Sequence, residues 1–165
     1  MNRLIALVAL SFILALVNIS IWHKQQHLAN GQPVLLELAP VDPRSLIQGD
    51  YMVLRFKLAG DIDDALTTQS KPLTNHQGYA IISLDNNGVA SLVRIDNGTA
   101  LADDELRIEY RVRDHRIKFA TNAFFFQEGT ADVYSTARYG MFRLNDNGEP
   151  LLTDLYDSEL KRLSP

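Results

Sequence analysis

Apolar residues form one continuous stretch at the start of the chain, and beyond it they mostly alternate with polar residues. Residues 4–22 include no charged side chain. As a helix, these nineteen residues would be about 28 Å long, which is enough to cross the hydrocarbon core of a bilayer. Trp22 ends the stretch, and its amphipathic ring favours the headgroup layer. The pattern predicts an N-terminal transmembrane helix.

A cleaved signal peptide is the alternative interpretation of this stretch, but it needs a short apolar core and a small-x-small cleavage site. The core here is long and no Ala-x-Ala follows it, so we expect an uncleaved signal anchor. Arg3 and the N-terminus lie on one side of the span and Lys24 on the other, and only three residues precede the span. We therefore expect the N-terminus in the cytoplasm and the rest of the chain outside it.

After Pro33 the chain consists of short strands and turns. Strands are predicted at residues 34–38, 51–58, 79–84, 89–95, 106–112, 141–144 and 150–153. Two hairpins are indicated by turns that end in Asn-Gly, at residues 85–88 and 145–148. Short helices are predicted within residues 60–66, from Thr130 to about Tyr139 and within residues 157–163, and residues 122–126 are expected to be buried.

The strand pattern predicts a mainly β (α+β) fold, a small antiparallel barrel or sandwich with one or two short helices. A single-layer sheet could not bury this many apolar side chains. We divide the chain into a transmembrane anchor (residues 1–23), a juxtamembrane linker (24–33) and an extracytoplasmic β-rich domain (34–165).

Charge and composition exclude several functions. The chain carries a net charge of −4, and removing Arg3, the one charged residue before His23, leaves −5. An acidic domain argues against nucleic-acid binding. The absence of cysteine excludes disulfides, thiol catalysis and thiolate metal sites. His23 and His27 share a helical face but lack the HEXXH pattern, so we expect neither a metal nor a cofactor.

A rigid turn and a Gly-Asp corner precede the strand that begins at Tyr51. Pro43 fixes its own φ and favours extended geometry at Asp42. Gly49 allows backbone shapes that other residues resist, and Asp50 follows it. In the strand itself, Met52, Leu54 and Phe56 would share one face.

This run resembles the signature of the bacterial GDYXXLXY family. Gly49, Asp50, Tyr51 and Leu54 match the pattern, and Phe56 stands where the pattern has tyrosine. The segments Asp42-Pro43-Arg44-Ser45-Leu46, Phe126-Gln127-Glu128-Gly129 and Ala137-Arg138-Tyr139-Gly140 also look like this family, so the similarity covers residues 34–156. The resemblance implies a compact extracytoplasmic domain on one helix in the inner membrane, and an association with polytopic membrane proteins of unknown role. It implies no reaction.

Carboxylates near the corner are the first candidates for chemistry. Asp42 and Asp50, with Arg44, could do acid–base work or hold a cation, or they could simply cap and neutralise a turn. Ser45 would be a nucleophile only if a lysine activated it, and no lysine motif is recognisable. Glu128, before Gly129, could be functional beside its phenylalanines or could support the next helix.

Four basic residues form the other candidate site. A two-residue turn at Asp114-His115 would place Arg113 opposite Arg116 and Arg111 opposite Lys118. Like charges directly across a strand pair are destabilising. This face could bind an anionic surface, or it could be an ordinary solvated face.

The expected function is that of a single-pass envelope protein that acts as a non-enzymatic accessory or interaction subunit of a polytopic membrane protein. One alternative is an envelope hydrolase that uses Ser45 or the Asp42/Asp50 corner. The other is a binding module for an anionic envelope component.

Overall fold

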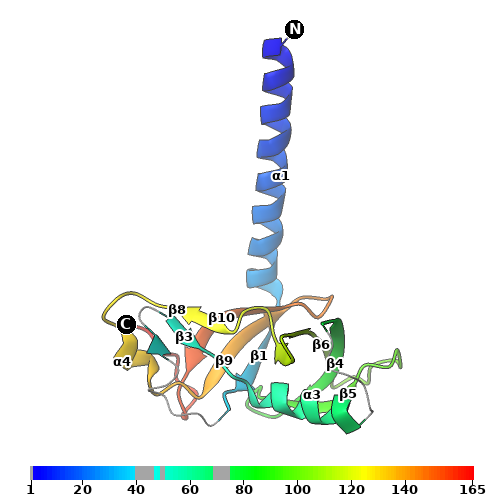
Figure 1. Ribbon diagram of the computed structural model, residues 1–165, viewed down its shortest axis with the longest axis vertical. Helices are drawn as coiled ribbons and strands as arrows, with labels where there is room; N and C mark the ends of the chain where they lie inside the picture. The colour runs from blue at the N-terminus through cyan, green and yellow to red at the C-terminus, as the bar shows by residue number, and fades with distance from the viewer. Residues whose placement is uncertain (1, 40–46, 49–50, 69–74) are drawn as a thin grey trace.

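The computed structural model describes residues 2–39, 47–48, 51–68 and 75–165. In chain order the elements are α1 (Asn2–Asn30), β1 (Gln32–Glu37), β2 (Ile47–Gln48), β3 (Tyr51–Val53), α3 (Lys57–Thr68), β4 (Gln77–Leu84), β5 (Ala90–Ile95), β6 (Glu105–Arg113), β7 (Arg116–Lys118), β8 (Ala123–Phe125), α4 (Ala131–Tyr134), β9 (Tyr139–Leu144) and β10 (Pro150–Tyr156). Strands predominate, and α1 stands apart from them as one long helix (Figure 1).

Helix α1 rises from one side of the β domain (Figure 1). Within the described chain, Leu7–Asn30 is the stretch that is long and apolar enough to cross a membrane, with a mean hydropathy of 1.7. Its side chains from Leu7 to Trp22 are exposed, because the domain packs against none of them. The helix ends where the Gly31 N–H donates to the His27 carbonyl at 3.0 Å. Its length and composition are those of a membrane-spanning segment.

The strands form three antiparallel sheets that together curl into a half-barrel (Figure 1). Their strand orders are β1-β9-β10, β2-β3-β8 and β5-β4-β6-β7. Two backbone hydrogen bonds join the first and third sheets: Leu35 N–H donates to Gly88 O at 2.9 Å, and Glu109 N–H donates to Gly148 O at 2.8 Å. The prediction of a mainly β, barrel-like antiparallel fold is confirmed.

Helix α3 covers the side of the half-barrel away from α1 (Figure 1). Leu58, Ile62 and Leu66 recur every fourth residue and are at most 3% exposed. This spacing places them on one helical face, which packs toward β1, β5 and β7. The core is therefore closed by a helix on one side and by curled sheet on the others.

The strand predicted over residues 51–58 is too long. β3 ends at Val53, Phe56 makes only an isolated bridge to Leu38, and α3 begins at Lys57. The short helix predicted within residues 60–66 is a helix of 12 residues, because apolar side chains recur at helical spacing across it.

The helix predicted from Thr130 to about Tyr139 is also wrong in its extent. α4 has only four residues, Ala131–Tyr134, and the Thr130 hydroxyl donates to Gln127 O at 2.6 Å instead of capping it. Tyr139 and Gly140 lie in β9, where they pair with both β1 and β10. Ladder bonds on two sides outweigh the local helical signal here.

Two smaller predictions are wrong as well. Residues 122–126 are not buried as predicted: four of the five are half-buried, and the Phe125 side chain is 74% exposed. Residues 157–163 form a turn and a bridge rather than a helical turn. The Asp157 carboxylate accepts two backbone N–H groups of that turn, each at 2.9 Å, as an Asx turn does.

Candidate functional site

The corner that the sequence singles out lies outside the described residues. It comprises Asp42, Pro43, Arg44, Ser45, Gly49 and Asp50. The roles proposed for these residues, in chemistry or in turn formation, therefore stay predictions. The structure does describe the strand and the loop that follow the corner.

Residues 52–56, which complete the signature after Tyr51, contribute to the core. Met52, Leu54 and Phe56 are at most 2% exposed, which confirms that they share the inner face. The Phe56 ring packs edge-on against Phe142 at 5.3 Å and Phe119 at 6.0 Å between ring centroids. A phenylalanine suits these apolar surroundings, because a hydroxyl buried there would need a partner.

Tyr51 has a different position from the rest of the signature. It is half-buried in β3 and lies directly opposite Phe125 in β8. The two rings are tilted, with centroids 5.7 Å apart. Cross-strand aromatic pairs of this kind stabilise short strands, so the Tyr51–Phe125 pair helps to hold β8 against β3.

The basic hairpin has the predicted register. Arg113 lies opposite Arg116, and Arg111 lies opposite Lys118. Both residues of the connecting turn have positive φ, 52° and 57°, which is the geometry of a two-residue type I′ turn. The sequence therefore predicted this pairing correctly.

The four basic side chains do not form one uniform surface. Arg111 Nη2 donates to Ala120 O at 2.6 Å, and Arg113 Nη1 donates to Val112 O at 2.8 Å. These two guanidinium groups are thus partly engaged by the chain itself. Among the described residues, Arg116 has no hydrogen-bonded or ion-paired side-chain partner.

A cleft of about 400 Å³ lies between β7 and residues 53–56. Arg116 and Lys118 line one wall, and Arg55 lines the other. Lys118 has one weak ion pair, with Asp114 at 3.9 Å. We call this the basic cleft (Arg55, Arg116 and Lys118). Three cations around one hollow, in an otherwise acidic chain, can hold an anionic group.

The other motif residues lie in different elements. Glu128 and Gly129 belong to the loop before α4, and Tyr139 begins β9. The Glu128 side chain is exposed, so the apolar surroundings that a functional carboxylate would need are missing. Gly129 has a φ of 81°, which explains a glycine at this turn.

The base of α1 is fixed to β9 by two hydrogen bonds. His27 is buried, and its Nε2 donates to Arg143 O at 2.8 Å. The Arg143 side chain donates in turn from Nη1 to Gly31 O at 3.1 Å. We call His27, Gly31 and Arg143 the joint. It sets the direction of α1 relative to the β domain.

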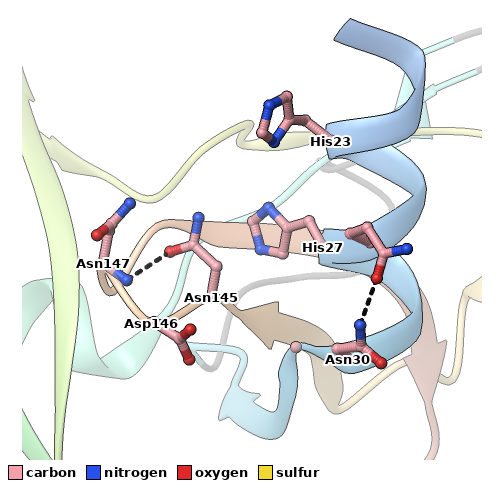
Figure 2. Close-up of a pocket in the computed structure, with 8 residues that line it drawn as sticks. His23, His27, Asn30, Asn145, Asp146 and Asn147 are labelled. Atoms are coloured by element: carbon pink, nitrogen blue, oxygen red, sulfur yellow. Dashed lines mark hydrogen bonds between the residues drawn. The ribbon is translucent and has the colours of Figure 1, made fainter. Parts of the chain in front are cut away.

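A polar hollow of about 320 Å³ lies beside the joint, between α1 and the turn of residues 145–148 (Figure 2). Figure 2 shows His27 directed toward this turn. The labelled lining residues are His23, His27, Asn30, Asn145, Asp146 and Asn147. Amides dominate this lining, and they suit hydrogen bonding more than catalysis.

The joint and the exposed Phe125 were missed at the level of sequence. The His23–His27 spacing indicated only a shared helical face. Nothing in the sequence pairs His27 with Arg143, which lies 116 residues further on. Over the described residues, no group of three His, Asp or Glu side chains could hold a metal ion.

The fold and the joint define a class of protein, a curled β-rich half-barrel at the end of one apolar helix. The sequence model of the GDYXXLXY protein family matches residues 13–155, and the chain belongs to this family. The resemblance noted above is thereby confirmed. No curated protein and no solved structure matches the chain.

Proposed function

We propose that this protein is a single-pass envelope protein of the inner membrane and a non-enzymatic accessory subunit of a polytopic membrane protein. Its N-terminus (residues 1–23) would be the anchor, residues 24–33 the juxtamembrane connection, and residues 34–165 the extracytoplasmic domain. The observation that carries the proposal is the uncovered apolar helix α1, joined at its base to the β domain.

A fixed joint suits a protein that presents its domain to a neighbour. The hydrogen bonds of the joint connect the helix to β9 and favour one orientation of the domain relative to the anchor. A partner that binds α1 would therefore meet a defined face of the domain. A flexible linker would lose that geometric advantage.

Asn18 is the natural contact for a partner helix. It lies in the apolar stretch, and its Nδ2 donates to Leu14 O at 2.8 Å. Its side-chain oxygen remains able to accept a hydrogen bond. Such interhelical bonds contribute about 0.6 kcal/mol on average in membranes.

The test is in-cell crosslinking of the full-length protein at native expression, followed by capture in mild detergent and mass spectrometry. We expect one dominant polytopic partner. Asn18→Leu should lower its capture about threefold, the equivalent of ~0.6 kcal/mol. Ser20→Leu, on a different face of the helix, is the matched control. A lone monomer after capture would contradict the proposal.

A second candidate function is binding of an anionic envelope component in the basic cleft. The specific support is that Arg116 and Lys118 converge with Arg55 on one hollow. Arg111 and Arg113 already bond backbone carbonyls, so they would contribute mainly long-range charge.

This candidate is tested with full-length protein in zwitterionic nanodiscs, mixed with separate anionic vesicles. Arg116→Glu should reduce vesicle binding at least fivefold, because each basic residue near an anionic surface contributes about 1 kcal/mol. Arg113→Glu has the same charge change outside the cleft and should reduce binding less. Equal losses would indicate general electrostatics instead of a site.

The hydrolase alternative stays a prediction, because Ser45, Asp42 and Asp50 lie outside the described residues. It requires that Ser45→Ala or Asp50→Asn abolish complementation of a deletion strain. Full complementation by both variants would rule it out.

A further inference from the structure

Phe125 is an apolar side chain that the fold leaves in solvent. It is 74% exposed, more than any of the large apolar side chains described in α1. Burying a phenylalanine stabilises by roughly 2 kcal/mol, so leaving it exposed forgoes that contribution. A single exposed apolar residue is ordinary on its own, and its meaning depends on where it lies.

The neighbours of Phe125 determine which way it points. Phe124 and Phe126 both pack against Tyr134, with ring centroids 5.2 and 5.3 Å apart. Side chains alternate along an extended chain, so Phe125 projects away from these two. Tyr51 supports its ring from the adjacent strand.

β8 lies on the side of the domain from which α1 rises (Figure 1). The chain reaches β8 from the base of the helix itself. Ala120 and Thr121 line a hollow of about 400 Å³ together with Lys24 and His27 of α1. The segment that leads into β8 therefore lies beside the place where the anchor leaves the domain.

The distance between the apolar stretch and the domain is short. From Trp22 to the buried His27 the helix rises five residues, or about 7–8 Å. The headgroup region on each side of a bilayer is roughly 5–7 Å thick. With Trp22 at the edge of the hydrocarbon, the domain surface at His27 would lie at the outer limit of the headgroups. The two hydrogen bonds of the joint favour this placement of the domain beside the base of the helix.

We propose that Phe125 inserts into the headgroup layer of the same membrane that α1 enters, as a second lipid contact of the domain. This rests on the membrane anchoring put forward under Proposed function. Lipid is the occupant because the surface adjoins the anchor and because an aromatic ring beside a tyrosine suits the interface. Lys24, at the helix base, would face anionic headgroups at the same level.

The test uses the single tryptophan of the chain. Full-length protein is placed in liposomes whose lipids carry bromine near the headgroup end of the acyl chains, which quenches nearby tryptophan. Native Trp22 reports whether the anchor is inserted. In a Trp22→Phe background, Phe125→Trp reports on the proposed contact. Its emission should fall roughly twofold relative to unbrominated lipid, as expected for an interfacial ring.

Val93→Trp in the same background is the matched control. Val93 is 46% exposed and lies in β5, on the side of the domain away from α1 (Figure 1). Its emission should not change. Because the chain has no cysteine, Phe125→Cys with a nitroxide label gives a second measurement, in which oxygen should relax the label more than a water-soluble nickel complex does.

The outcomes separate the two proposals. Quenching at positions 22 and 125 supports both. Quenching at position 22 with full emission at position 125 overturns the lipid contact and leaves the anchor intact. Full emission at both positions overturns the anchoring, and the lipid contact with it.

Discussion

The two turns at residues 85–88 and 145–148 have almost the same sequence and the same internal bonds. In each turn the first side chain accepts the backbone N–H groups two and four residues further on. In each, the closing glycine, Gly88 or Gly148, has a φ of 80°. Considered as isolated turns, they are equivalent.

Their surroundings differ. Both glycine carbonyls accept a bond from another sheet, Gly88 from Leu35 and Gly148 from Glu109. A Cβ at Gly88 would meet open space, whereas a Cβ at Gly148 would lie 2.6 Å from Arg107 O. The second turn also lies beside the base of α1 (Figure 2). Local sequence specifies the turn, and tertiary packing decides how strongly the fold depends on it.

The largest expected effect comes from alanine at the two glycines. Gly88→Ala should cost about 1 kcal/mol, because it adds only left-handed backbone strain. Gly148→Ala should cost roughly 3 kcal/mol, because the backbone at Arg107 must also move. Urea unfolding of the full-length protein in detergent, followed by circular dichroism, measures both. Equal losses would show that the difference in packing has no energetic weight.

The joint offers a second way to separate the two turns. His27→Leu removes the bond to Arg143 O, a loss of about 1 kcal/mol. Hydrogen exchange should speed up in residues 145–148 and stay unchanged in residues 85–88. His23→Leu is the matched control, since the bond to Arg143 O comes from His27 alone. Faster exchange in both turns would mean that the joint supports the whole domain instead of one side.

The smallest expected effect is a pH dependence of the folding stability, and it comes from Glu105 in β6. The hydrogen bond from Arg94, and then that from the Ala102 N–H, hold the pKa of Glu105 below its ordinary value of 4.5. A lowered folded-state pKa gives stability that is present above pH 4.5 and is lost as pH falls through the lowered pKa.

Glu105→Gln should therefore flatten the acid end of the stability curve and destabilise the protein at neutral pH. Unfolding midpoints between about pH 3 and pH 7 measure the change. Arg94→Gln should have a similar effect, because the two side chains form one ion pair. If the loss of stability at low pH is the same in the variants as in the native protein, other carboxylates cause that loss.

Features encoded by neighbouring residues were predictable. Asn-Gly turns and alternating strands specify both hairpins. The alternation of apolar residues shifts by one position across Asp114-His115, and this shift predicted a two-residue turn that pairs Arg113 with Arg116. The start of α3 was not, because the alternation of apolar residues 52–56 continues as a strand pattern up to Leu58, which already lies in the first turn of α3. The ends of α4 and β9 depend likewise on ladder partners far along the chain.

The candidate sites divide in the same way. The register of Arg116 and Lys118 follows from local sequence, but their convergence with Arg55 depends on how the sheets curl. The bond between His27 and Arg143 depends on where α1 meets β9. The exposure of Phe125 was not predictable, because three consecutive phenylalanines suggest burial. Only the packing of Phe124 and Phe126 against Tyr134 shows which of the three rings is left in solvent.

Because α1 continues as a helix into the joint, its length determines how the domain is rotated about the helix axis. An α-helix turns by about 100° for each residue. One residue inserted between Trp22 and His27 would therefore swing the domain by about 100° and move it by about 1.5 Å along that axis. A neighbour that contacts one stripe of the anchor thereby selects which flank of the domain stands next to it. In the accessory-subunit role proposed above, the number of residues in this short stretch would set the angle at which the domain meets its partner.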